Sequence, residues 1–156
     1  LGLPVLRKET YDAFITQTRS IGDYEKGIKF LEGLFNRIKV KDPLYALFIH
    51  GASNMWPREV KDLACADLIT GYELLSIEGE LPLLDQEKFK RRWEGTMNRV
   101  VAILNVGANM PIIEKDNPVF ARFIKDSAIP YRQTSRINIL SDLSSGYMFL
   151  ADNVKP

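Results

Sequence analysis

The residue types that most often catalyse reactions or bind metals are scarce in this chain, which has one cysteine, Cys65, and one histidine, His50. A single cysteine excludes a disulfide within the chain and is consistent with a reducing compartment, so we expect an intracellular, cytoplasmic protein. We expect His50, which ends an apolar run, to cap or pack a helix end. Cys65 has the acidic neighbours Asp62 and Asp67, which predicts an unreactive, buried thiol.

Sequence motifs of known chemistry are also absent. The chain has no phosphate-binding glycine loop, no dinucleotide-binding glycine pattern and no nucleophile elbow. The acids Glu59, Asp62 and Asp67 follow no calcium-loop pattern, and one histidine with one cysteine cannot complete a structural zinc site. We therefore nominate no catalytic residue, metal ligand or cofactor, although an enzyme that uses carboxylates and arginines without histidine remains a third alternative.

No apolar run approaches the ~18 residues that a membrane-spanning helix needs, so we expect no membrane span. Hydrophobic residues make up 46% and charged residues 26% of the 156 positions, which is typical of a globular protein. We predict one domain over residues 1–156, with an apolar N-terminal arm at 1–7. A C-terminal segment over 131–156 is expected to dock on the core.

Apolar residues recur mostly at intervals of three or four, which predicts an all-α domain of about six or seven helices. We expect helices over residues 8–21, 24–38, 44–51, 57–76 and 85–104, and a short one from Asn117. A buried strand is the alternative over 44–51. Near 136–140 a strand or irregular segment is the alternative to a last helix, and residues 105–111 are predicted to be a loop.

The strongest helix signal lies over residues 85–104. Asp85 is a suitable N-cap, and the apolar residues share one face. That face consists of Phe89, Trp93, Met97, Val100 and Leu104. We expect it to pack on the core.

Charge is distributed unevenly along the chain. Residues 1–41 carry eight basic and five acidic residues, residues 42–85 two and eight, and residues 86–156 eleven and seven, which gives +3, −6 and +4. Segments of opposite charge can attract another copy of the chain, or they can pair internally or remain solvated.

Basic residues gather in two places, which suggests an interface for RNA or another polyanion. The predicted nucleic-acid-binding residues are Lys88, Arg91, Arg92, Arg99, Arg132 and Arg136. A phosphate backbone could lie across both sets only if the fold brings them together. The alternative is a solvated helix face with local pairs such as Glu87–Arg91.

Large apolar residues in expected loops and near the chain ends either fill the core or contact a partner. The predicted interface residues are Met55, Trp56, Met110, Ile112 and Tyr147, with Trp56 and Met110 as the main anchors. Our leading hypothesis is a non-enzymatic helical interaction or assembly module, of the scaffold or viral-structural type. It would self-associate into a homo-oligomer or dock a protein partner. A nucleocapsid-like RNA-binding protein is the alternative, and the two functions can coexist.

Overall fold

A computed structural model describes residues 2–154, and within that range the chain forms eight helices and no strand. The helices are α1 (Lys8–Arg19), α2 (Tyr24–Lys41), α3 (Pro43–Ser53), α4 (Arg58–Glu78), α5 (Gln86–Thr96), α6 (Arg99–Asp116), α7 (Pro118–Ala128) and α8 (Gln133–Ala151). The all-α prediction is confirmed. The strand alternatives over 44–51 and 136–140 are wrong, because both segments lie within helices, α3 and α8. Leu1, Lys155 and Pro156, which we placed in terminal segments, lie outside the described residues.

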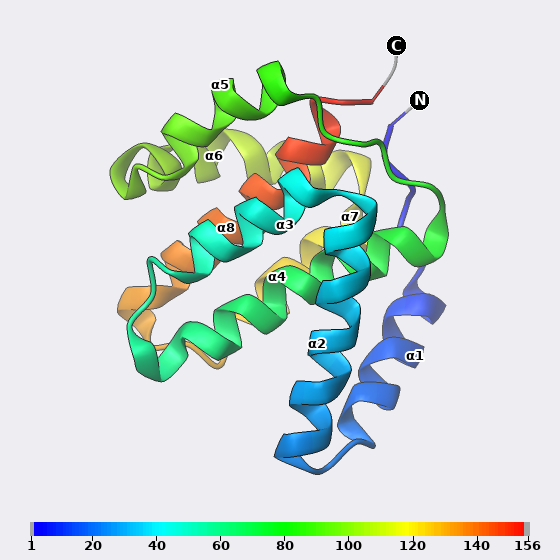
Figure 1. Cartoon of the computed structure of the whole chain (residues 1–156). Coiled ribbons are helices and arrows are strands. Elements are labelled where there is room, and N and C mark those ends of the chain that lie inside the picture. Colours follow the sequence, from blue (N-terminus) through cyan, green and yellow to red (C-terminus); the bar gives the residue numbers. More distant parts are fainter. Residues whose placement is uncertain (1, 155–156) are drawn as a thin grey trace.

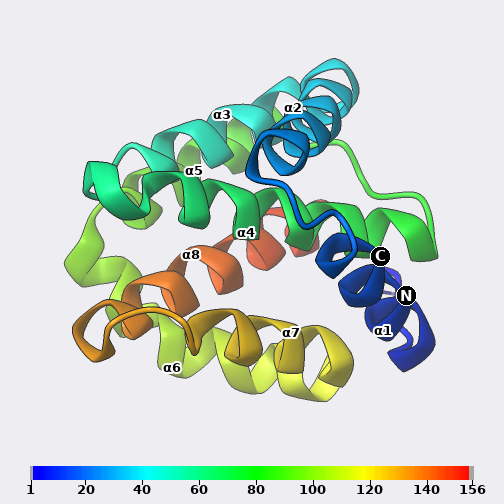
Figure 2. The ribbon, with the colours of Figure 1, turned by 90° about the horizontal axis from the view of Figure 1, so that it is seen from below.

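The core is organised around α8, which packs against α3, α4, α5, α6 and α7. In Figure 2, α4 and α8 lie side by side in the middle of the molecule, with α3 on one side and the pair α6 and α7 on the other. Ten of the 19 residues of α8 are buried, from Ile139 to Leu150. In the part of the chain that is described, no helix is both long and apolar enough to cross a membrane.

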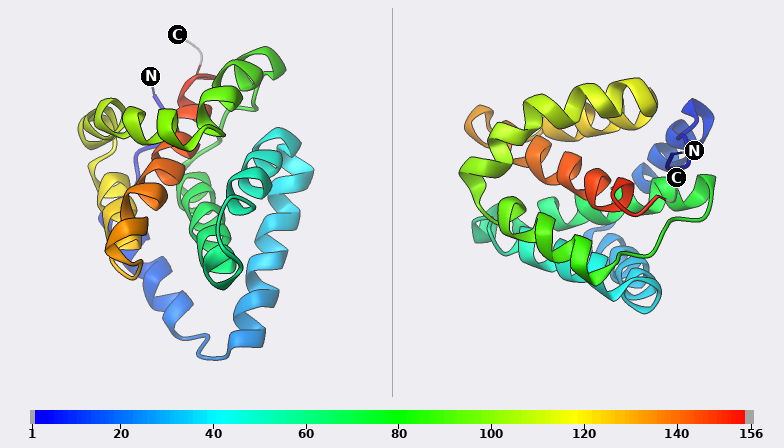
Figure 3. Two further views of the ribbon diagram at one scale, coloured as in Figure 1. Left: turned by 90° about the vertical axis from the view of Figure 1, so that its left-hand side faces the viewer. Right: turned by 90° about the horizontal axis from the view of Figure 1, so that it is seen from above.

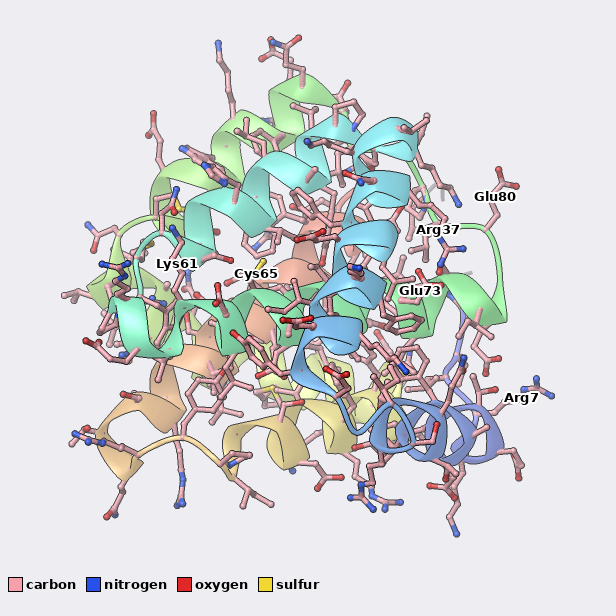
Figure 4. All side chains as sticks on the ribbon, turned by 60° about the horizontal axis from the view of Figure 1, so that its bottom comes forward. Arg7, Arg37, Lys61, Cys65, Glu73 and Glu80 are labelled. Carbon is pink, nitrogen blue, oxygen red and sulfur yellow. The ribbon has the colours of Figure 1, made fainter. Side chains whose placement is uncertain are left out.

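Helices α1 and α2 diverge from a turn that projects away from the other helices, as Figure 1 and the left panel of Figure 3 show, and both helices pack against α4. The turn between them contains Gly22 at a φ of 62°, a conformation that favours glycine. The buried residues of α2, Leu34 and Ile38, lie in its C-terminal half. There, Arg37 points toward Glu73 of α4, with 3.4 Å between Nη2 and Oε1 (Figure 4).

Asp42 starts α3 and also anchors a distant loop. Its side chain accepts a hydrogen bond from the backbone N–H of Tyr45, and Pro43 occupies the first turn. The second carboxylate oxygen accepts a hydrogen bond from the backbone N–H of Leu84 at 3.1 Å. The sequence predicted the helix start, whereas the contact with Leu84 depends on tertiary structure.

Asn117, just before α7, fixes the N-terminal arm to the body. Its side-chain oxygen accepts a hydrogen bond from the N–H of Leu6 at 2.8 Å, and its amide donates one to the carbonyl of Pro4 at 2.8 Å. Leu3 and Leu6 are buried. Within residues 2–7, the arm therefore packs on the domain.

The prediction of one helix over 85–104 is wrong. The chain forms two helices, because α5 ends at Thr96 and the side chain of Asn98 accepts a hydrogen bond from the N–H of Val101 to cap α6. The apolar periodicity does not continue through this break. Val100 is 69% exposed and Leu104 is 74% exposed, so neither packs on the core as expected.

The predicted loop over 105–111 is also wrong, because it lies within α6. Val106 and Met110 are buried against the rest of the domain, and this packing outweighs the low helix propensity of Pro111. Gly107, whose carbonyl loses its helical hydrogen bond at Pro111, is exposed to water, which limits the cost of that loss.

Candidate protein interface on α6

Helix α6 has an exposed face that carries no charge. Between residues 100 and 112, the exposed residues of α6 are Val100, Val101, Leu104, Asn105, Gly107, Ala108, Pro111 and Ile112. We call this set the outer face of α6. Only Asn105 has a polar side chain, whereas the solvent-facing side of a surface helix normally carries charged and polar residues.

The opposite face of α6 is apolar too. Ala102, Val106, Met110 and Ile113 are buried on that side together with the single polar residue Asn109, where α6 packs against α5, α7 and α8. A helix that is apolar all round is normally covered on every side. Within residues 2–154, α6 is covered on one side only. A contiguous apolar surface of this kind is typical of a protein interface.

Charged residues lie at the C-terminal end of the outer face. Glu114, Lys115 and Asp116 are exposed there, and Glu114 forms an ion pair with Lys125 of α7 at 2.7 Å. Arg99 stands at the N-terminal end. An apolar centre with polar ends resembles the core and rim of protein interfaces.

The structure places the five predicted interface residues in different surroundings. Trp56, Met110 and Tyr147 are buried, with exposed fractions of 6%, 8% and 4%. These three side chains belong to the core of the domain and offer little surface to a partner. Met55 is 36% exposed and Ile112 is 45% exposed, and only Ile112 lies on the outer face of α6. That these residues contact a partner stays a prediction.

Trp56 belongs to a buried polar cluster with Asp142 and Arg99. Its Nε1 donates a hydrogen bond to Asp142 Oδ2 at 2.7 Å, and Arg99 Nη1 donates one to Asp142 Oδ1 at 2.7 Å. The guanidinium of Arg99 also lies 5.4 Å from the centre of the Trp56 ring. Burial raises the pKa of Asp142, although the charge of Arg99 and both hydrogen bonds oppose that rise. Arg99 therefore stabilises the fold.

Other predicted RNA-binding residues also make contacts within the domain. Arg92 Nη2 donates a hydrogen bond to Asp152 Oδ1 at 2.8 Å, and Lys88 Nζ donates one to the carbonyl of Asp152 at 3.2 Å. Arg136 donates to two backbone carbonyls of the loop before α8, including that of Tyr131. Among the described residues, no ion pair involves Arg91 or Arg132.

The two basic sets lie toward opposite ends of α8. Lys88 and Arg92 contact Asp152 just after its last residue, whereas Arg132 and Arg136 lie at its start. The 19 residues of α8 make a helix about 28 Å long at roughly 1.5 Å per residue. Lys88 and Arg92 are therefore separated from Arg132 and Arg136 by about the length of α8, whereas Arg99 lies between them through its bond to Asp142. RNA binding stays a prediction.

Several residues of the outer face of α6 were missed from the sequence. Val100 and Leu104 were assigned to the core, and Ala108 and Pro111 to a loop. The cap-type residue Asn98 was the available signal for a second helix.

In the range 2–154, no three or more histidine, cysteine, aspartate or glutamate residues are grouped so that they could hold a metal ion. Comparisons of the chain with protein-family models, with curated proteins and with solved structures found no match.

Proposed function

We propose that this protein is an assembly module that binds a second copy of itself through the outer face of α6. The observation that carries the proposal is the uncharged, exposed apolar surface over residues 100–112. Leu104 illustrates the cost of leaving it uncovered. At 74% exposed, its side chain would gain up to roughly 1.5–3 kcal/mol if an interface buried it fully.

The order of side-chain sizes along the outer face suits a two-fold contact. Val100 and Leu104 lie toward one end, Pro111 and Ile112 toward the other, and Gly107 lies between them. A β-carbon on Gly107 would meet nothing within 4 Å, so another helix can approach closely at this point. An antiparallel crossing of two α6 helices there places the large side chains of each copy against those of the other.

Charge favours the same orientation. The N-terminal end of a helix carries a partial positive charge and the C-terminal end a partial negative charge. Lys115 and Lys125 balance the charges of Glu114 and Asp116 at the C-terminal end of α6, so the helix dipole alone supplies the negative charge there. In an antiparallel pair, this end of each copy lies near the positive N-terminal end of the other, whereas a parallel pair would bring like charges together.

The area available predicts a weak association. The outer face spans 13 residues, or about 20 Å of helix. A stable interface buries about 800 Å² on each partner, which is more than one helix face supplies. We therefore expect a dimer with a dissociation constant in the micromolar range, and tighter binding only where neighbouring surfaces add contacts.

Light scattering over a range of protein concentrations tests this proposal. The wild-type chain should shift from monomer to dimer as its concentration rises. Leu104→Glu should stay monomeric, because a charge would be buried in the apolar contact. The matched control is Val40→Glu, at a residue of α2 that is 87% exposed. It should associate as the wild type does. A monomeric wild type, or equal association of both variants, would contradict the proposal.

A further inference from the structure

A second feature of the molecule is a polar pocket between α5, α6 and the C-terminal end of α8. Its volume is about 430 Å³. Figure 1 and the right panel of Figure 3 show α5 and α6 beside the last turns of α8. The lining residues are Lys88, Arg91, Arg92, Gly95, Thr96, Asn105, Asn109, Ser145 and Asp152. The pocket lies within one chain, and among its lining residues Asn105 alone also belongs to the outer face of α6.

The charge of the pocket is positive. Lys88, Arg91 and Arg92 supply three positive charges and Asp152 supplies one negative charge, which leaves a net charge of +2. Asp152 is already bound by Arg92 and Lys88. Arg91 is exposed, and within residues 2–154 it forms no ion pair, so its guanidinium is available to an anion.

Three buried polar side chains line the same pocket. Thr96, Asn109 and Ser145 have exposed fractions of 6%, 7% and 4%. In the described part of the chain, none of these three side chains makes a hydrogen bond. The polar atoms of these three side chains are not among the fully enclosed atoms that lack a partner, which are Tyr72 Oη, Asn138 Oδ1 and Ser141 Oγ, so they open onto the pocket. A polar ligand in the pocket would form hydrogen bonds with them in place of water.

We propose that this pocket binds a phosphate group. A phosphate offers several strong acceptor oxygens, which match the hydroxyl and amide donors of Thr96, Asn109 and Ser145. Arginine binds phosphate through paired N–H groups, a role that suits Arg91. The volume falls within the range of small-ligand pockets and suits a group about the size of a nucleotide. The phosphate can belong to a free nucleotide or to an RNA backbone, since the chemistry of recognition is the same.

Titration calorimetry with three probes tests this proposal: inorganic phosphate, adenosine monophosphate and a single-stranded oligouridylate. In Arg91→Gln, the affinity for each probe that binds should fall roughly tenfold or more, because a charge-assisted hydrogen bond is lost. The matched control is Lys90→Gln. It removes one positive charge from the neighbouring exposed residue of α5, which does not line the pocket. It should bind as the wild type does.

Ser145→Ala separates ligand binding from folding. The Ser145 hydroxyl makes no hydrogen bond within residues 2–154, so its removal should leave the free energy of unfolding unchanged or raise it. The affinity for phosphate should nevertheless fall severalfold. A purely structural serine would give the opposite pattern, with lower stability and unchanged binding, and that result would overturn the proposal.

The probes also separate the two sources of phosphate. Binding of the mononucleotide as tightly as the oligouridylate identifies a nucleotide pocket. Tighter binding of the oligouridylate, with a steep dependence on salt, identifies contact with an RNA backbone. Either result supports a phosphate site. Failure of all three probes to bind at millimolar concentration, or equal losses in Arg91→Gln and Lys90→Gln, would overturn it.

Discussion

Replacement of Asp67 by asparagine should stabilise the protein at alkaline pH. Asp67 of α4 is half-buried, and its Oδ2 accepts a hydrogen bond from Tyr131 Oη at 2.7 Å. Burial raises the pKa of Asp67 to about 7, although the hydrogen bond from Tyr131 opposes that rise. Asparagine keeps the shape and the acceptor oxygen, so the variant removes only the cost of burying the charge.

The sign and size of the effect follow from the pKa values. The folded chain binds the proton of the Asp67 carboxyl group more tightly than the unfolded chain does. The protonated group therefore contributes its full stabilisation to the free energy of unfolding below pH 3.8. This stabilisation is lost as the pH rises to about 7. The shift corresponds to an upper limit of about 4 kcal/mol, of which about 3 kcal/mol would be lost between about pH 5 and about pH 8. Water in the adjoining groove between α1, α2, α4 and α7 reduces the measured value.

Urea unfolding followed by far-UV circular dichroism at several pH values measures the difference between wild type and Asp67→Asn. Asp42 and Asp142 also have pKa values raised by burial. The wild type and Asp67→Asn both retain these two residues, so the difference in their stability isolates the effect of Asp67. The matched control is Asp62→Asn, at an exposed residue of the same helix, which should keep the wild-type pH dependence. The reasoning is refuted if Asp67→Asn is less stable than wild type at about pH 8, or if their difference does not grow with pH.

Two further substitutions probe the core. Gly146→Ala should lower the free energy of unfolding by about 1–3 kcal/mol, because the added β-carbon would lie 2.7 Å from Tyr45 Oη. Its control, Gly33→Ala in α2, meets nothing within 4 Å and should stabilise by roughly 0.5–1 kcal/mol. Asp142→Ala should cost about 3–5 kcal/mol, because it leaves the Arg99 guanidinium without its carboxylate. Chemical denaturation measures all three, and a neutral Gly146→Ala or Asp142→Ala would contradict the packing described.

Local signals predicted the helical class and several helix starts. The pair Asp42–Pro43 opens α3 as expected, because capping and proline geometry act within a few residues. The local signal of Pro111 led to the wrong prediction of a loop, because the buried inner face of α6 keeps the helix intact there. Asn98 was a usable capping signal that was overlooked within a strong apolar periodicity.

Contacts between distant residues could not be predicted. Trp56 lies in an expected loop and was predicted to contact a partner. In the structure its indole donates a hydrogen bond to Asp142, which is 86 residues away in the sequence. The outer face of α6 was missed because apolar residues on both sides of a helix predict burial on both sides. Thr96, Asn109 and Ser145 come together only when α5, α6 and α8 pack.

The central claim is that two copies pair through antiparallel α6 helices that cross near Gly107 and Ala108. Oxidative cross-linking of Ala108→Cys tests this crossing, because cysteines at a two-fold axis lie close enough for a disulfide. The native thiol, Cys65, is partly buried, and burial raises its pKa, which lowers its background reactivity. We expect Ala108→Cys to form a covalent dimer rapidly, and Val40→Cys to form one slowly. Equal rates for the two variants would contradict the claim.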